Sequence, residues 1–355
     1  MEKQLLYDLL NVATVVGNEE AGQEIALAYG KEWADQQLTD AVGNTISVVN
    51  PEAEFKVLLC GHMDEIGFRV TNITDAGLIQ VQEAGGVRPK LYIGAPMQII
   101  HETEEDGKIV RHKVPGVGVT SPVMLKNADF ETKDILIDIG ASSKEEAAAV
   151  VAIGDSVCGD TEVRELLGEN FTCRALDDKT GVFVILEAVK KAKAAGAKIG
   201  LYANAAVGEE TTCRGAYFAS ATIKPDCAVI VDVTFASDAP DFPASRSGEV
   251  KLGKGPVLCH SGVTNKKLNR LMAEIAKEKD IPIQWEVSGG RTYTDGDTVQ
   301  QTVSGVPFTL ISIPLRYMHS SVEVGNWQDL AWCIDLIAEF LVRIDKEFDF
   351  RPIKA

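Results

Sequence analysis

Two histidines and several groups of acidic residues stand where catalytic sites are built in α/β proteins. His62 and His319 lie beside other polar residues at the predicted ends of apolar strands. Acidic residues occupy similar positions, and in chain order they are Asp177 with Asp178, Glu209 with Glu210, Asp232, and Asp295 with Asp297. Because open α/β sheets build their sites at the carboxyl ends of strands, we expect these side chains to converge. Any one of them alone is more typical of a turn, a helix cap or a solvated edge.

Asp232 is the acidic residue that a structural role accounts for least well. It lies within the apolar run 229–233, which reads Val-Ile-Val-Asp-Val, so its carboxylate is expected to be buried. Burying a polar group without a partner costs about 2–7 kcal/mol. A bound cation would offset that cost.

The residue types also indicate which cation would fit. Two imidazoles with several carboxylates, and no closely spaced pair of cysteines, suit Zn²⁺, Co²⁺ or Mn²⁺ better than a structural cysteine-rich zinc site. A dinuclear hydrolytic centre needs a bridging carboxylate, a histidine and a carboxylate for each ion, and a free carboxylate that takes a proton from water. The residues above contain that set, so the sequence predicts a hydrolase that uses two divalent metal ions.

Helices and buried strands alternate on both sides of a region of short β-strands. The opening segment 3–38 has apolar residues at helical spacing and predicts two helices. Apolar runs predict buried strands at 46–49, 57–60, 199–207 and 227–233, and helical spacing predicts helices at 180–195, 266–279 and 330–344. From 68 to 163, β-rich pieces are cut by Gly, Pro and Asp turns. This pattern predicts one α/β domain, residues 1–67 and 164–355, interrupted by a small all-β domain at 68–163.

Composition and charge exclude several classes of function. The 355-residue chain is 45% hydrophobic and long enough to bury a sizeable core. Its formal net charge of −17 repels phosphate backbones and anionic lipid headgroups, which disfavours nucleic-acid and membrane-surface partners. The first residues lack a basic region followed by an apolar block, and no apolar run is long enough to cross a bilayer. The seven cysteines contain no Cys-x-x-Cys pair, as in reduced proteins, so we expect a cytoplasmic protein.

Five motifs resemble those of the M42 family of metallo-aminopeptidases, which includes the glutamyl aminopeptidases and the tetrahedral TET peptidases. In chain order they are Gly61-His62-Met63-Asp64-Glu65-Ile66-Gly67-Phe68, Arg174-Ala175-Leu176-Asp177-Asp178-Lys179-Thr180-Gly181, Gly208-Glu209-Glu210, Val231-Asp232-Val233 and Arg316-Tyr317-Met318-His319-Ser320. They span almost the whole chain, and together they are specific although each alone is weak. The resemblance implies a zinc-peptidase-like α/β/α catalytic domain with an inserted all-β domain, PDZ-like or barrel-like, that mediates dimerisation. It also implies peptide substrates and a tetrahedral dodecamer built from dimers.

The resemblance further implies how the two ions would be held. His62 and Asp232 would bind one ion, Glu210 and His319 would bind the other, and Asp177 would bridge both. In related enzymes the peptide bond that follows the bridging aspartate is cis.

Two more carboxylates receive roles from the resemblance. Glu209 matches the general base, which takes a proton from the attacking water and then supplies a proton to the leaving amine. Glu209 and the ligand Glu210 are neighbours, so their separate roles require a turn, which Gly208 makes available. Asp64 matches a carboxylate behind the ligands, and since residues two apart in a strand point the same way, it is expected to accept from the ring of His62.

Two segments depart from the family pattern. Many members read Gly-Gly-Thr-Asp near the pocket, whereas here the segment 289–297 contains extra residues, among them Arg291. Members often have Pro-Pro-His in the β domain, where this chain reads Thr-Ser-Pro-Val at 120–123. The guanidinium of Arg291 could pair with the side chain of an N-terminal Glu or Asp, which raises the hypothesis of a preference for acidic N-termini. The alternative is that Arg291 is a solvated loop residue or forms a salt bridge with one of the many acids of an overall acidic surface.

Two other functions stay open at this point. Paired carboxylates and four tryptophans would suit a metal-independent carbohydrate hydrolase, but that function leaves His62, His319 and the buried Asp232 unexplained. An aromatic content of 6% is also low for a sugar-binding cleft. A non-catalytic metal-binding scaffold would have no use for Glu209, which ligates nothing in the scheme above.

Overall fold

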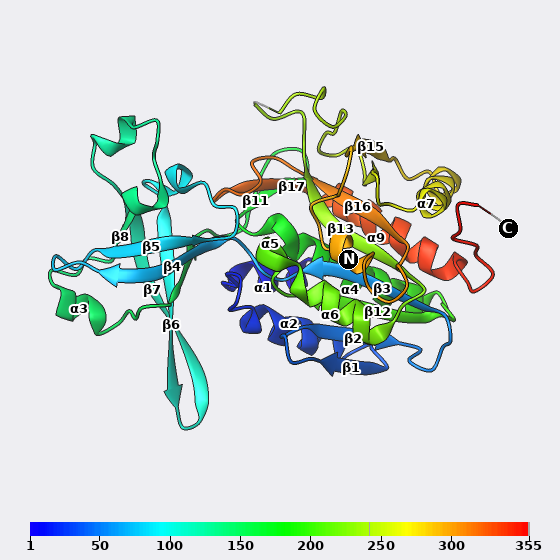
Figure 1. The fold of residues 1–355 in the computed structure, drawn as a ribbon, viewed down its shortest axis with the longest axis horizontal. Helices are drawn as coiled ribbons and strands as arrows, with labels where there is room; N and C mark the ends of the chain where they lie inside the picture. The colour runs from blue at the N-terminus through cyan, green and yellow to red at the C-terminus, as the bar shows by residue number, and fades with distance from the viewer. Residues whose placement is uncertain (241, 354–355) are drawn as a thin grey trace.

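The fold is organised around a mixed eight-stranded sheet with the strand order β1-β2-β12-β3-β13-β16-β14-β15 (Figure 1). The computed structural model of the chain describes residues 1–240 and 242–353. The strands are β1 (Gln36–Thr39), β2 (Thr45–Val49), β12 (Gly200–Ala206), β3 (Lys56–His62), β13 (Cys227–Phe235), β16 (Phe308–Leu315), β14 (Val257–His260) and β15 (Gln284–Val287). The centre of the sheet is a group of four mutually parallel strands, β12, β3, β13 and β16. Their carboxyl ends therefore meet at one edge.

Helices cover both faces of this sheet because the strands are apolar on both sides. In β3, Val57 and Leu59 pack into the core on one face, and Leu58 and Cys60 pack into the core on the other. The first core includes residues of α1 (Lys3–Asn11), α2 (Glu20–Gly30), α4 (Leu176–Ala194), α7 (Lys266–Glu278) and α9 (Trp327–Arg343). The second includes residues of α6 (Arg214–Ile223) and α8 (Gly296–Val299). The result is the predicted mixed α/β layering.

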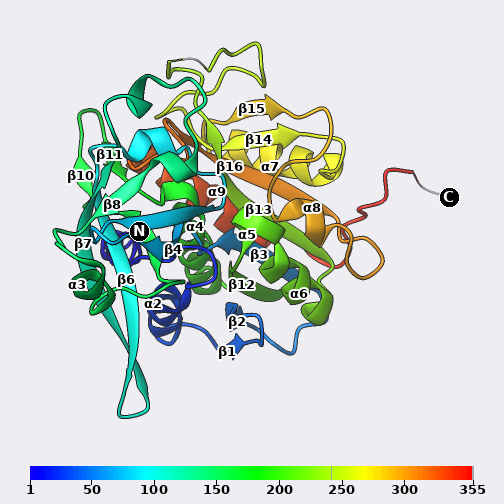
Figure 2. The same cartoon turned by 60° about the vertical axis from the view of Figure 1, so that its left-hand side comes forward.

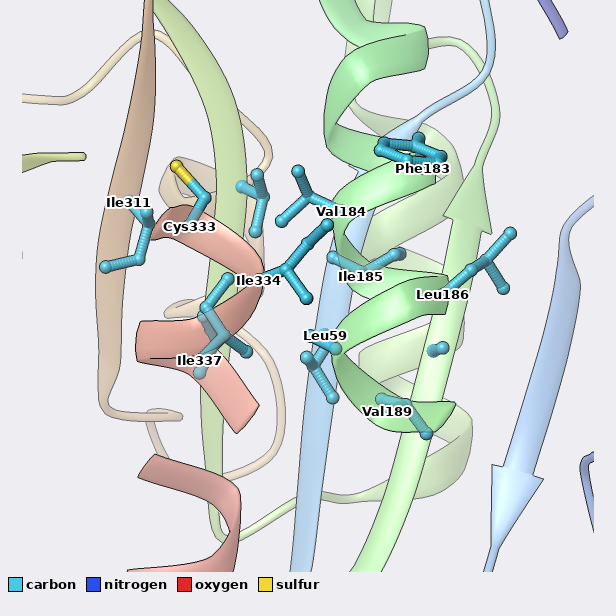
Figure 3. Close-up of a cluster of buried hydrophobic side chains, with 14 of the residues drawn as sticks. Leu59, Phe183, Val184, Ile185, Leu186, Val189, Ile311, Cys333, Ile334 and Ile337 are labelled. Atoms are coloured by element: carbon cyan, nitrogen blue, oxygen red, sulfur yellow. The ribbon is translucent and has the colours of Figure 1, made fainter. Parts of the chain in front are cut away.

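Helix α4 is buried on nearly all sides from Leu176 to Val189, and its middle, residues 182–186, is a run of five apolar residues. Figure 3 shows Val184 and Ile185 of α4 facing Ile334 and Ile337 of α9 beside the strands of the sheet. Each fully buried aliphatic side chain of this kind contributes about 1.5–3 kcal/mol. The start of α4 is therefore held firmly beneath the carboxyl edge of the sheet.

A closed barrel with the order β4-β5-β8-β7-β6-β9 lies beside the large sheet (Figures 1 and 2). Its strands are β4 (Gly67–Ile73), β5 (Ile79–Ala84), β6 (Pro96–Glu105), β7 (Lys108–Val119), β8 (Leu136–Asp138) and β9 (Ser156–Gly159). The barrel has its own core, which includes Phe68, Ile79 and Ile99. The same segment contains the helix α3 (Lys144–Ala148) and 3₁₀ turns at Pro89–Tyr92, Met124–Lys126 and Thr132–Asp134, so it is not purely β. The domain bounds given above stay a prediction.

A small third sheet joins two segments that carry site residues. It consists of β10 (Arg164–Glu165), β11 (Asn170–Cys173) and β17 (Glu323–Asn326), all antiparallel. Strand β11 leads into α4, and β17 follows the segment of His319. Cys173 lies opposite Glu323 in the register, which brings the beginning of α4 close to the segment that follows His319.

Most predicted elements are present, but the opening segment contains an additional strand. Residues 36–39, predicted as the end of a helix, form the strand β1, which pairs with β2 at the edge of the sheet. The predicted strands at 46–49 and 57–60 are β2 and β3, and the helix predicted at 330–344 is α9. Among residues 1–240 and 242–353, no helix is long and apolar enough to span a membrane.

Candidate metal centre

The candidate metal ligands gather at the carboxyl edge of the central parallel strands. His62 is the last residue of β3, and Asp232 lies in the carboxyl half of β13. Glu210 follows β12 and His319 follows β16, while Asp177 lies at the start of α4. The topology thus brings together residues from five separate segments, at the edge where such sheets build their sites.

These residues form two clusters that share Asp177. One cluster is His62, Asp177 and Asp232, and the other is Asp177, Glu210 and His319; within each, one ligand atom per residue lies within 4.8 Å of the others. Asp177 Oδ1 lies 3.2 Å from His62 Nε2, and Asp177 Oδ2 lies 3.2 Å from His319 Nε2. A bridging carboxylate needs two oxygens that face two separate ligand sets in this way.

The charges at the site suit bound cations. Asp232 is 6% exposed, as its apolar surroundings predicted. Burial raises the pKa of Glu210 and Asp232 well above the ordinary values, and the neighbouring charge of Asp177 raises them further. Burial lowers the pKa of His62, but the hydrogen bond with Asp177 and nearby carboxylates outweigh it and raise the pKa overall. Imidazole and carboxylate donors crowded in a buried site, with excess negative charge, fit divalent transition metals.

A sharp turn gives Glu209 and Glu210 different directions. Gly208 has φ +70°, and a Cβ atom there would collide with the guanidinium of Arg214. The one-turn helix α5 (Glu209–Thr212) begins directly after this glycine. Glu209 Oε2 lies 3.8 Å from His62 Nε2, whereas Glu210 Oε1 lies 3.6 Å from His319 Nε2. Two adjacent carboxylates therefore face the two different clusters.

The environment of Glu209 suits a proton acceptor. Burial raises the pKa of its carboxyl to about 8, and the charges of Asp295 and Asp177 act in the same direction. A general base works best when its pKa is near the working pH, because it is then both ionised and basic enough to take the proton. Asp295 is itself buried, and burial raises its pKa to about 8.

The carboxylate of Asp64 contacts other groups than the predicted ring of His62. The Nδ1 atom of His62 lies 3.0 Å from the main-chain carbonyl oxygen of Asp64, whereas the Asp64 carboxylate is 3.6 Å from that nitrogen. The carboxylate instead accepts hydrogen bonds from the backbone N–H groups of Glu209 (3.1 Å) and Glu210 (3.0 Å). The prediction was wrong in this detail because β3 ends at His62, so the strand alternation does not extend to Asp64.

Two further buried carboxylates contact the site segments, and sequence reasoning did not assign them these contacts. Asp178 accepts from the backbone N–H groups of His62 (3.1 Å) and Gly181 (3.0 Å), and the bond between Asp177 and Asp178 is cis, as the resemblance implied. Glu323 accepts from the N–H groups of Asp177 (3.1 Å) and His319 (2.9 Å). The sequence signal for Glu323 is weaker than that for Asp232, because Val322 and Val324 flank it but Ser321 and Gly325 lie beyond them.

A buried ion cluster lies beside the centre. Glu65 Oε2 is 2.8 Å from Arg174 Nη1, and Glu65 Oε1 is 3.2 Å from Lys179 Nζ. All three side chains are at most 3% exposed. Burial raises the pKa of Glu65, but the two cations outweigh it and hold the pKa below its ordinary value. The cluster fixes the segment before Asp177 against the segment after His62.

Arg291 lies on the exposed surface of its loop. Its guanidinium stacks on Tyr293, with the central carbon 4.4 Å from the ring centroid. The carboxylate of Asp297 shapes the loop by accepting from the N–H groups of Thr292 and Tyr293, each at 2.8 Å. Arg291 is not among the described residues that line the cavity beside the second cluster.

That cavity lies against both the metal centre and the barrel segment. Its walls include Asp177, Glu210 and His319 of the second cluster together with Ile66, Tyr92 and Ser320. Tyr92 belongs to the segment between β5 and β6, so the barrel segment contributes part of the wall.

Comparison with known proteins agrees with this geometry. A lysyl aminopeptidase of Pyrococcus furiosus is 33% identical over 98% of this chain and 99% of its own. The structure of a TET aminopeptidase from a marine sediment Thaumarchaeota archaeon has a TM-score of 0.89 at 28% identity, over 97% of each chain. The TET1 peptidase of Pyrococcus horikoshii, which can assemble into a tetrahedron or an octahedral shell, has a TM-score of 0.82 at 30% identity, over 96% of this chain and 99% of its own.

Two other relatives bear on substrate preference and on the carbohydrate alternative. A glutamyl aminopeptidase of Lactococcus lactis is 26% identical over 82% of this chain and 81% of its own. A structure described as an endoglucanase of Thermotoga maritima has a TM-score of 0.74 at 26% identity, over 95% of this chain and 96% of its own. The family model of the M42 glutamyl aminopeptidases matches residues 43–336. This chain therefore belongs to the M42 family of peptidases and is an aminopeptidase.

Proposed function

We propose that this aminopeptidase works with two divalent metal ions and removes single residues from the N-termini of peptides. The observation that carries the proposal is the sharing of Asp177 by two ligand clusters, each of which also contains one histidine and one further carboxylate. His62, Asp177 and Asp232 would hold one ion, and Asp177, Glu210 and His319 would hold the other. Zn²⁺, Co²⁺ and Mn²⁺ all suit these donors.

The chain's own residues supply the proton transfers and the positioning. Divalent ions, when bound, polarise a scissile carbonyl and make water easier to deprotonate. Glu209, whose Oε2 faces the first cluster, takes a proton from the attacking water and returns a proton to the leaving amine. Asp64 holds Glu209 in place through the backbone N–H groups of the turn. The side chain of Glu209 is 12% exposed, so little of it contacts bulk water.

Removal of metal is expected to abolish peptidase activity and leave the fold largely intact. The apolar cores of the large sheet contain no residue of the two ligand clusters, so they do not depend on metal for burial. Dialysis against a chelator should eliminate release of p-nitroaniline from leucyl anilide, while the far-ultraviolet circular dichroism changes little. Restoring activity with Co²⁺ or Zn²⁺, with two ions per chain by elemental analysis, is the expected control. An active purified protein without transition metal would contradict the proposal.

Assays on the same chelated and metal-reloaded protein distinguish the two alternative functions from peptide hydrolysis. A metal-independent carbohydrate hydrolase would release reducing sugar from soluble glucan after chelation, and a non-catalytic scaffold would bind metal without turnover on either substrate. Metal-dependent hydrolysis is favoured because His62 and His319 both face Asp177, an arrangement for which a paired-carboxylate glycosidase has no use.

We retain a preference for acidic N-termini as a proposal, with Arg291 as its determinant. If Arg291 pairs with the substrate side chain, Arg291→Ala should lower kcat/KM for glutamyl anilide by about tenfold or more and leave leucyl anilide unchanged. If Arg291 instead stays stacked on the exposed Tyr293 when substrate binds, the two substrates should behave alike. Equal kcat/KM changes for the two anilides would remove Arg291 from substrate recognition. Lysyl anilide serves as the third substrate. If Arg291 contacts the substrate side chain, its guanidinium would repel the lysyl cation.

We further propose that residues 68–163 form a dimerisation domain and that the dimers build a tetrahedral dodecamer in the cytoplasm. The barrel supports this proposal because it has a separate core and lies at one side of the large sheet, with the β6–β7 hairpin extending away from it (Figure 1). All seven cysteines are free, which fits a reducing compartment. The native mass from light scattering tests the assembly.

A further inference from the structure

Glu323 is a buried carboxylate whose two oxygens contact two different ligand segments. It is 2% exposed and opens strand β17. Its Oε2 accepts from the N–H of Asp177 (3.1 Å), and its Oε1 accepts from the N–H of His319 (2.9 Å). One side chain therefore joins the residue shared by both clusters to a residue that belongs to the second cluster alone.

Glu323 holds the main chain of His319, and the imidazole has a separate contact, since its Nδ1 lies 3.1 Å from the carbonyl oxygen of Gly86. His319 has φ +63° and lies after the end of β16. The pairing between strands of the large sheet therefore does not hold its backbone. The backbone of Arg316 still pairs with Val324. Between these two points the main chain turns sharply, and the hydrogen bond to Glu323 fixes the N–H of His319 within that turn.

The other ligand segments are held in the same manner by other carboxylates. Asp178 accepts from the N–H of His62, and Asp64 accepts from the N–H groups of Glu209 and Glu210. Hydrogen bonds from N–H groups to a carboxylate are stronger than those between neutral groups. Each of these buried carboxylates thus fixes the main chain of a ligand segment.

We propose that Glu323 is a positioning residue that sets the affinity of the Asp177–Glu210–His319 cluster for its metal ion. The proposal rests on the proposed dinuclear function. Glu323 acts on this cluster through both His319 and Asp177, whereas the first cluster keeps the separate support of Asp178 at His62. Loss of the Glu323 carboxylate should therefore weaken the two clusters unequally, with the larger loss at the cluster that contains His319.

The test measures Co²⁺ affinity at each cluster separately. In His62→Ala only the second cluster keeps its imidazole, and in His319→Ala only the first cluster keeps its imidazole. Each variant therefore serves as a background in which one cluster is studied. Glu323→Gln is combined with each, and Co²⁺ binding to the metal-free proteins is followed by visible absorption. In the His62→Ala background we expect Glu323→Gln to weaken binding by about 10–100-fold, as is typical when a partner of a metal ligand is lost. In the His319→Ala background we expect a change of less than about threefold, because the support of His62 is untouched.

Asp329 provides a matched control for the loss of a buried carboxylate. It is fully buried and accepts from the N–H groups of Gly253 (2.7 Å) and Gly255 (2.8 Å), away from the ligand clusters. Asp329→Asn should leave Co²⁺ affinity unchanged in both backgrounds. If it lowers affinity as much as Glu323→Gln, a general loss of stability accounts for both results and the proposal fails.

A second variant keeps the proposal testable if Glu323→Gln does not fold. Glu323→Asp retains the charge but is one methylene shorter, so it cannot reach both N–H groups, and it should also weaken the second cluster more than the first. Equal weakening of the two clusters, or unchanged affinity in either folded variant, would overturn the positioning role. Failure of the parent protein to bind any Co²⁺ would instead contradict the dinuclear function itself.

Discussion

Glu209→Gln is expected to lower kcat by about 10²–10⁴ while both metal ions stay bound. The amide has nearly the shape of the carboxylate, but it cannot take a proton from water. Glu209 contributes no atom to either ligand cluster, so its replacement should not release metal. The measurements are kcat on leucyl anilide and metal content per chain.

Glu210→Gln is the matched comparison for this variant. Glu210 is its neighbour on the same one-turn helix but belongs to the second cluster, so this replacement should lose metal together with activity. Near-native kcat in Glu209→Gln with both ions bound would reduce Glu209 to a structural role.

Glu65→Gln is expected to destabilise the protein by about 3–5 kcal/mol, because it leaves two buried cations without their partner. Arg174 and Lys179 both contact the Glu65 carboxylate, and all three side chains are buried. The loss would be measured as the free energy of unfolding of the metal-free protein in urea.

The control is an ion pair of similar geometry at the surface. Lys191 Nζ and Asp335 Oδ1 are 2.7 Å apart, but their side chains are 49% and 47% exposed. Asp335→Asn should cost less than about 1 kcal/mol because water and salt screen the pair. Similar losses in the two variants would show that burial of the Glu65 cluster adds nothing to stability.

Sequence reasoning selected the residues that form the two clusters because carboxylates of this kind are costly to bury outside a functional site. Asp232 is the clearest case, since a carboxylate in an apolar strand is costly to bury unless a cation or hydrogen-bond donors meet it. The same logic gives a weaker signal at Glu323, where the two flanking valines are not part of a longer apolar run. Its partners could not be predicted, because they are backbone N–H groups that only the folded chain brings within reach.

Errors in the prediction come from the ends of elements. Asp64 was expected to follow the alternation of β3, but the strand ends two residues earlier. Strand β1 was missed because Gln36–Thr39 is a mostly polar segment at the edge of the sheet. Neither of its faces is fully buried, so its sequence contains no apolar run that would indicate a strand. Arg291 illustrates a further limit, since residue type gives its charge but not the direction in which its side chain points.

Because Asp232 precedes His319 in the chain, all residues of the first cluster are synthesised before the second cluster is complete. The shared residue Asp177 is made midway through synthesis, whereas His319 and Glu323 lie close to the carboxyl end. A chain that stops before His319 therefore lacks one residue of the second cluster and the carboxylate that accepts from its N–H. If both clusters bind metal as proposed, such a shortened chain would be an inactive peptidase.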